Sequence, residues 1–184
     1  MTDRIRMLSR EEAPEEARAF YDQDERAFGV VLNPTHVMAH RPPILAAGRA
    51  LSRAVSTDAT LPAALRALVC VRIATRAGCP FCMDINAAGG SNAGISDEKL
   101  AALPEYQRSP LYTAAERAAL ELADAMTATP VDVPDELYAR LRTHYTEPQL
   151  VELAATGALE NYRARLNRVF LIESNALYCP VAKG

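Results

Sequence analysis

The sequence predicts an all-α fold, on the strength of three observations. Roughly half of the 184 residues are apolar and Ala is common, whereas aromatic residues make up only 6%, a composition that favours helix packing over strand pairing. Apolar residues recur at helical spacing, and no run alternating with a period of two is long enough to indicate a strand. Capping residues and prolines divide the chain into helix-sized pieces. The length fits one domain.

The amino-terminal quarter is predicted to contain a polar helical arm followed by the first core helix. The segment EEAPEEARAFYDQDERAFG is expected to form one exposed helix or two short ones, and VLNPTH is expected to be a loop. The segment PPILAAGRALSRAVS begins with Pro and places Ile44, Leu51 and Val55 near one helical face. We expect that face to point into the core.

The next segment, ALRALVCVRIATRAG, is apolar nearly all round apart from its arginines, which indicates a helix inside the fold. Thr60 is the expected N-cap, with Pro62 in the first turn. Gly78 supplies a stop signal, and a new helix is expected to begin at once through Cys79 and Pro80.

Capping residues also define the helices of the second half. Ser96 precedes a short helix, Thr113 has Glu116 at capping-box spacing, and Pro134 leads into DELYARLRTHY. A second box, Thr146 with Gln149, precedes the longest helical pattern, which runs from Leu150 to about Ile172. The apolar stripe predicted for that helix consists of Val151, Ala154, Leu159, Tyr162, Leu166 and Val169.

Charge and hydropathy exclude several classes of function. The net charge of −3 comes from interleaved acids and bases, without the basic run that nucleic acid or an anionic membrane surface would attract. The segment MTDRIRMLSREE lacks the apolar centre of a secretory signal, and no stretch has the ~20 apolar residues of a membrane span. We therefore expect no nucleic-acid or membrane partner and a cytoplasmic location.

The segment GCPFCMDIN places Cys79 and Cys82 at a predicted helix start, where unpaired backbone amides and the helix dipole favour a thiolate. A cysteine at the N-cap lies off the helix proper, so the pair can close into a disulfide. Three interpretations remain open at this point: a redox pair, a zinc clip, or inert thiols. A structural zinc site needs about four ligands, and no second CxxC or suitably spaced His pair supplies the rest.

Other residues are candidates for supporting roles around the pair. Asn86 lies one helical turn after Cys82, on the same stripe. Arg72 and Arg76, one turn apart on the preceding helix, would stabilise a thiolate if they faced it. Cys70 is expected to be a small core residue. The role of Cys179 is left open.

Two long stretches carry a family resemblance. LPAALRALVCVRIATRAGCPFCMDINAAGGSNAGISDEKLAAL and YTAAERAALELADAMTATPVDVPDELYARLRTHYTEPQLVELAATGALENYRARLNRVFLIE resemble the carboxymuconolactone decarboxylase and alkylhydroperoxidase (AhpD-like) family. The second stretch ends with Asn161, Arg165, Asn167 and Arg168 at the family's spacing. The resemblance covers about residues 30–175 and implies an all-helical fold that assembles into homo-oligomers. We therefore expect an arm (1–35), an AhpD-like domain (36–175) and an irregular tail (176–184).

The resemblance implies an alkylhydroperoxidase that reduces small hydroperoxides and is recharged by a dithiol or protein thiol, without cofactor or metal. Cys82 would attack the peroxide and Cys79 would resolve the product into a disulfide. Redox members of the family carry Glu and His at the positions that Ala67 and Asn86 occupy here. Two alternatives stay open: a cofactor-free lactone decarboxylase-like enzyme, and a non-catalytic, redox-responsive helical oligomer.

Overall fold

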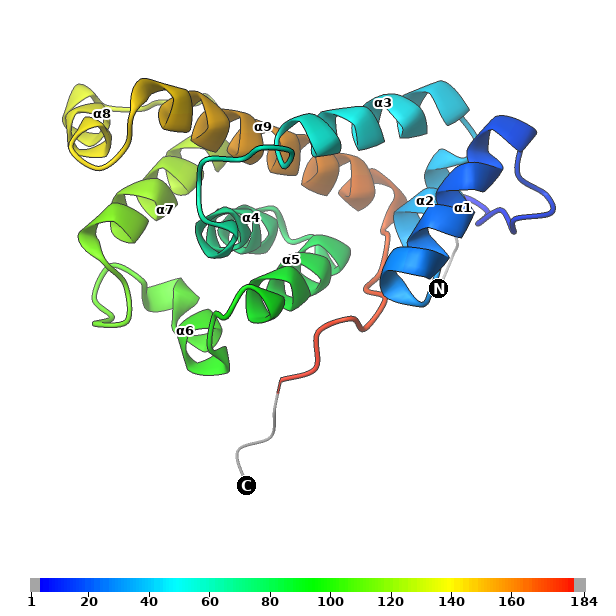
Figure 1. Ribbon diagram of the computed structural model, residues 1–184, viewed down its shortest axis with the longest axis horizontal. Helices are drawn as coiled ribbons and strands as arrows, with labels where there is room; N and C mark the ends of the chain where they lie inside the picture. The colour runs from blue at the N-terminus through cyan, green and yellow to red at the C-terminus, as the bar shows by residue number, and fades with distance from the viewer. Residues whose placement is uncertain (1–3, 181–184) are drawn as a thin grey trace.

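The computed structural model describes residues 4–180, and these form nine α-helices, one short 3₁₀ helix and no strand (Figure 1). The prediction of an all-α fold is confirmed. The elements are α1 (Glu15–Phe28), α2 (Asn33–Met38), α3 (Pro42–Ala54), α4 (Ala63–Ala77), α5 (Pro80–Asn92), α6 (Asp97–Ala101), η1 (Leu103–Glu105), α7 (Ala114–Thr127), α8 (Asp135–Arg142) and α9 (Glu147–Phe170). No helix within 4–180 is long and apolar enough to cross a membrane.

Helix α4 lies at the centre and packs against α5, α7 and α9 (Figure 1). Its apolar residues point in several directions, as its sequence predicted. Val69 and Ile73 pack with α7, α8 and α9, Leu68 packs with α5 and η1, and Ala74 packs against the two cysteines. Gly78 ends the helix in the left-handed conformation, at a φ of 65°. This placement delivers the CxxC segment directly to the core.

Most of the predicted caps are confirmed. Ser96 accepts a hydrogen bond from the backbone of α6, and capping boxes form at Thr113 and Thr146. The expected cap at Thr60 is wrong, because its hydroxyl and backbone N–H both donate to Glu152 of α9, each over 2.8 Å. Thr60 therefore joins the start of α4 to α9 instead of capping α4.

The loop expected at VLNPTH is wrong in part, because Asn33–Met38 forms α2. Pro34 lies in the first turn, where a proline costs no hydrogen bond. So short a helix needs tertiary support. The tail provides it, since the backbone N–H of Asn33 donates to the side chain of Asn175 over 2.9 Å.

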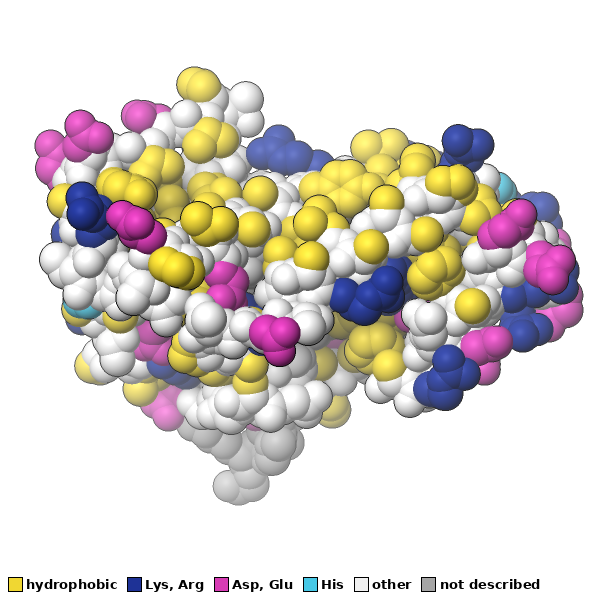
Figure 2. Space-filling view, turned by 45° about the horizontal axis from the view of Figure 1, so that its top comes forward, with side chains coloured by type: hydrophobic (Ala, Val, Ile, Leu, Met, Phe, Trp, Pro, Cys, Tyr) yellow, Lys and Arg dark blue, Asp and Glu magenta, His cyan; other side chains and the backbone are white. Residues whose placement is uncertain are grey.

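The predicted core faces of α3 and α9 are wrong in part, although Leu159 of the α9 stripe is buried as predicted. Ile44 and Leu51 of α3 remain 46% and 49% exposed, and Val151 and Val169 of α9 remain 70% and 56% exposed. Figure 2 shows hydrophobic side chains gathered on the face that these two helices form. The buried residues of α9 include four polar ones: Thr156, Glu160, Asn161 and Asn167. Helix α9 therefore turns a partly polar face toward the cysteines.

The arm packs at the end of the molecule opposite α8 (Figure 1). Helices α1 and α2 both contact α3, and Tyr21 of α1 donates to the carbonyl of Leu8 over 2.8 Å. The segment after α9 has no regular structure over its described residues. Asp84 of α5 holds it by accepting from the backbone N–H groups of Leu177 and Tyr178.

Candidate functional site

Cys79 and Cys82 form a disulfide at the amino terminus of α5, with their Cα atoms 5.3 Å apart. Cys79 is the N-cap residue in extended conformation and Pro80 takes the first helical position, which confirms the predicted local geometry. The backbone N–H of Cys82 donates to the Cys79 sulfur over 3.2 Å. In the reduced protein, the helix start would stabilise negative charge on either sulfur.

Asn167 of α9 contacts both sulfurs. Its amide nitrogen lies 3.4 Å from the sulfur of Cys82 and 3.8 Å from that of Cys79. The side chain is 2% exposed, and its carbonyl oxygen has no hydrogen-bond partner within the described chain. A buried amide whose N–H group points at sulfur is arranged to stabilise a thiolate, at the cost of an unsatisfied oxygen.

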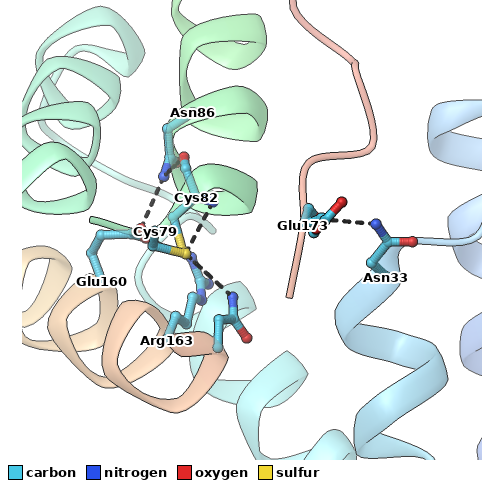
Figure 3. Close-up of a disulfide and its surroundings, with 8 residues drawn as sticks. Asn33, Cys79, Cys82, Asn86, Glu160, Arg163 and Glu173 are labelled. Carbon is cyan, nitrogen blue, oxygen red and sulfur yellow. Dashed lines mark hydrogen bonds and ion pairs between the residues drawn. A yellow bond between two sulfur atoms is a disulfide. The ribbon is translucent and has the colours of Figure 1, made fainter. Parts of the chain in front are cut away.

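Asn86 links the CxxC turn to a buried carboxyl group. Its amide nitrogen donates to the carbonyl of Cys82 over 2.8 Å and to Glu160 over 3.1 Å (Figure 3). Glu160 is 1% exposed, and burial raises its pKa to about 7, with Arg163 and Asn86 opposing the shift. Its second oxygen accepts no hydrogen bond within residues 4–180 and lies 3.5 Å from the guanidinium of Arg163.

A pocket of about 260 Å³ opens beside Cys82. Its lining comes from α1, α2 and α3 on one side and from α5 and α9 on the other: Phe28, Leu32, Pro34, Thr35, Met38, Leu45, Gly48, Arg49, Ser52, Phe81, Cys82, Ile85, Tyr162, Arg163 and Asn167. Most of these side chains are apolar, and two are arginines. The pocket suits a small, largely apolar molecule with one polar group.

Arg72 and Arg76 do not support the cysteines, which corrects the sequence-based expectation. Arg72 makes two hydrogen bonds to Asp124 of α7, of 2.7 and 2.9 Å, and stacks on Tyr106. Arg76 pairs with the same carboxylate at 3.6 Å. Neither arginine lines the pocket. Their charges hold α4 against α7 because α4 turns its arginines away from α5.

Glu160 and Arg163 were not predicted from the sequence as residues of the site. A signal was present, because Glu160 directly follows the apolar residues Ala158 and Leu159 in GALEN, and Arg163 follows one turn later. An acid inside an apolar helical stretch often marks a buried, functional group. Within 4–180, no group of three or more His, Cys, Asp or Glu side chains is placed to hold a metal ion.

Comparisons with known proteins agree with this architecture. A sequence model described as the carboxymuconolactone decarboxylase family matches residues 42–125. YnjA of Escherichia coli K12 is 39% identical over 113 residues, which are 61% of this chain and 62% of YnjA. The chain therefore matches about three fifths of that relative's length.

Two solved structures share nearly the whole fold. The debrominase Bmp8 is 25% identical, with a TM-score of 0.81, and the match covers 93% of this chain and 91% of Bmp8. A peroxidase-related protein with an alkylhydroperoxidase AhpD core, from Ralstonia eutropha JMP134, is 20% identical with a TM-score of 0.84, covering 94% and 92%. The family match over residues 42–125 and the helical arrangement around the CxxC pair support a relationship to the carboxymuconolactone decarboxylase and AhpD-like family, and the fold is AhpD-like.

Proposed function

We propose that this protein is an AhpD-like thiol oxidoreductase in which the Cys79–Cys82 dithiol reduces a small organic hydroperoxide. The observation behind this proposal is the position of Cys82, which is at once in the first turn of α5 and in the wall of the pocket. A thiolate there is stabilised by the helix and faces a space large enough for a substrate.

The chemistry needs two steps. The Cys82 thiolate attacks the terminal oxygen of ROOH, the O–O bond breaks, and the leaving alkoxide takes up a proton to become ROH. The Cys79 thiol then attacks the sulfenic sulfur of Cys82, which forms the disulfide and releases water. A dithiol or protein thiol returns two electrons and two protons to the disulfide. A reducing compartment such as the cytoplasm supplies such donors.

The apolar lining points to an organic hydroperoxide in preference to hydrogen peroxide. Phe81, Tyr162 and Leu45 offer contact surface that only an organic group would use. The proposal predicts that reduced protein reacts faster with an aromatic hydroperoxide, such as cumene hydroperoxide, than with hydrogen peroxide. Stopped-flow measurement at equal concentrations gives the ratio of the two rates.

The decisive variant is Cys82→Ser, with Cys179→Ser as matched control, because Cys179 is an exposed free thiol outside the pocket. We expect the first variant to lose peroxide consumption and the second to retain it. Full activity in Cys82→Ser overturns the proposal. Negligible turnover in wild type, combined with a large shift of melting temperature on reduction, favours the redox-responsive oligomer instead.

A second candidate is reductive dehalogenation of a small haloaromatic compound. The aromatic lining beside Cys82 favours it, as does the likeness to the debrominase Bmp8. The dithiol would supply two electrons and two protons, converting an aryl bromide to the arene and HBr as the disulfide forms. Bromide release from a brominated pyrrole or phenol under reducing conditions, absent in Cys82→Ser, is the test.

We further propose that copies of this chain associate through the face that α3 and α9 expose. Four large hydrophobic residues are at least 46% exposed there: Ile44 and Leu51 on α3 and Val151 and Val169 on α9 (Figure 2). Such a shared apolar face is typical of subunit contacts. Light scattering should find an oligomer in wild type and a smaller species in Leu51→Glu. An unchanged mass in Leu51→Glu argues against this interface.

A further inference from the structure

Glu160 and Arg163 lie on one face of α9, between the CxxC turn and the pocket. Glu160 reaches the turn through Asn86, and Arg163 lines the pocket together with Cys82. In Figure 3 both side chains extend from α9 toward the disulfide. The ion pair therefore links the buried side of Cys82, next to Asn86, with the pocket, from which a substrate would approach Cys82.

The bonding of this pair is incomplete. Glu160 accepts one hydrogen bond, from Asn86, while its second oxygen has none and faces the guanidinium at 3.5 Å. Arg163 also donates to the hydroxyl of Ser52 on α3. A buried carboxylate oxygen without a hydrogen bond destabilises the ionised form of Glu160. The ionised and protonated forms are therefore close in free energy, and both are accessible. The pKa of about 7 agrees with this geometry.

We propose that Glu160 and Arg163 are positioning residues that set the ionisation of Cys82 in the reduced protein, an inference that rests on the proposed thiol chemistry. Ionised Glu160 neutralises Arg163 and opposes a second negative charge nearby. Protonated Glu160 leaves the positive charge of Arg163 free to stabilise a thiolate at the pocket wall. The proton that leaves the Cys82 sulfur is then held on Glu160, and no electron moves.

This arrangement replaces the side chains that are absent at the family's usual positions. Asn86 cannot take up a proton at neutral pH, but its amide ties the carboxyl of Glu160 to the backbone of Cys82. The titratable group is thereby on α9, whereas the family's usual positions, Ala67 and Asn86 here, lie on α4 and α5.

The groups that face Glu160 come from three helices: Arg163 from α9, Asn86 from α5 and Cys70 from α4. Cys70 does not compete for the charge, because burial first and the nearby Glu160 second raise the pKa of its thiol far above neutral. Asn86 is neutral. The pH response is therefore expected to depend on Glu160, Arg163, Cys82 and the neighbouring thiol of Cys79.

The test is the rate at which iodoacetamide alkylates Cys82 in the reduced full-length protein between pH 5 and 10, resolved from Cys79 by tandem mass spectrometry. Two interacting groups titrate over a stretched pH range, whereas a single group gives a simple sigmoid. We expect a more stretched profile in wild type than in Glu160→Gln, where only the coupling between the Cys82 and Cys79 thiols remains. Near pH 7.5 the variant should react about threefold faster, because its thiol pKa is lower.

Arg163→Gln should act in the opposite direction, with alkylation about threefold slower at pH 7.5, whereas Arg163→Lys should restore most of the rate. Glu152→Gln is the matched control, because Glu152 is another acid of α9 with an arginine partner, Arg66, and lies outside the pocket. Its profile should follow that of wild type.

Coinciding profiles for wild type and Glu160→Gln, with melting curves and helical circular dichroism confirming that the variant is folded, overturn the inference. So does a slower reaction in Glu160→Gln. Alkylation requires no peroxide, so it tests the inference independently of the peroxidase proposal. If the profile of Glu160→Gln is shifted but the wild-type protein reduces no hydroperoxide, the inference is supported and only the peroxidase proposal is wrong.

Discussion

Two buried carboxyl groups, Asp24 of α1 and Glu160 of α9, have very different surroundings although both are 1% exposed. Asp24 accepts from the backbone of Leu32, from the hydroxyl of Thr35 and, through both oxygens, from Arg49 at 2.8 and 3.0 Å. Glu160 accepts a single hydrogen bond, from Asn86, and its second oxygen lies 3.5 Å from the guanidinium of Arg163.

The difference in hydrogen bonding between Asp24 and Glu160 suits them to different roles. The fully bonded Asp24 joins α1, α2 and α3, and so fixes the wall of the pocket that lies before residue 42, where the family match begins. The incompletely bonded Glu160 lies beside the CxxC turn. Buried charges with complete bonding hold elements together, whereas incompletely bonded ones respond to protons or ligands.

Asp24→Ala should have the largest effect, a loss of about 4 kcal/mol of unfolding free energy, because it leaves the partly buried Arg49 unpaired and removes the acceptor of Leu32 and Thr35. Urea denaturation measures the loss. Asp22→Ala is the matched control, since Asp22 of the same helix pairs with Arg10 at the exposed surface, where such pairs contribute about 1 kcal/mol at most. Equal losses in both variants would contradict the structural role of Asp24.

Glu160→Gln should stabilise the protein, and only at higher pH. Burial raises the pKa of Glu160 from 4.5 to about 7, so the folded state binds more protons than the unfolded state between these values, and stability falls as pH rises. Above pH 7 the variant should gain about 3 kcal/mol over wild type, and the gain should vanish below pH 4.5. Melting temperatures from pH 4 to 8 check this. A gain independent of pH would show that the charge is not its origin.

Asn167→Ala should raise the pKa of the Cys82 thiol by removing a donor to its sulfur. At a pH below that pKa, we expect alkylation of reduced Cys82 to slow about tenfold, equivalent to about 1.4 kcal/mol. Asn161→Ala is the control, because Asn161 bonds to Gly157 and Thr127 and does not contact sulfur. Similar slowing in both variants would indicate a general loosening of α9.

Thr35→Val should have the smallest effect. Its hydroxyl bonds to Asp24 and receives a bond from Arg49, and those two groups keep their direct pairing in the variant. We expect a loss of about 1 kcal/mol in urea denaturation. A loss as large as that of Asp24→Ala would mean that the hydroxyl, more than the ion pair, joins the arm to α3.

Local features of the fold were predictable in detail. The cap at Ser96, the boxes at Thr113 and Thr146, the stop at Gly78 and the helix start at Cys79 all depend on contacts within about four residues. Such contacts follow directly from the local sequence. They identified the CxxC pair as the first candidate for a catalytic role.

Which helical face is buried was not predictable from periodicity alone. Apolar residues line the exposed side of α3 and α9 as well as the core side. In the sequence, an exposed apolar stripe through Ile44 or Val151 has the same spacing as a buried one. The burial of Glu160 and Asn167 depends on partners from α5, far along the chain.

The sequence by itself therefore determined the helical class, most helix ends and the thiol pair, because these follow from composition and from short-range hydrogen bonding. Only the tertiary structure decided that Arg72 and Arg76 bind Asp124, that the arm lines the pocket, and that Glu160 and Arg163 lie near Cys82. These contacts join residues far apart in the chain, and their partners are selected by how the helices pack around α4.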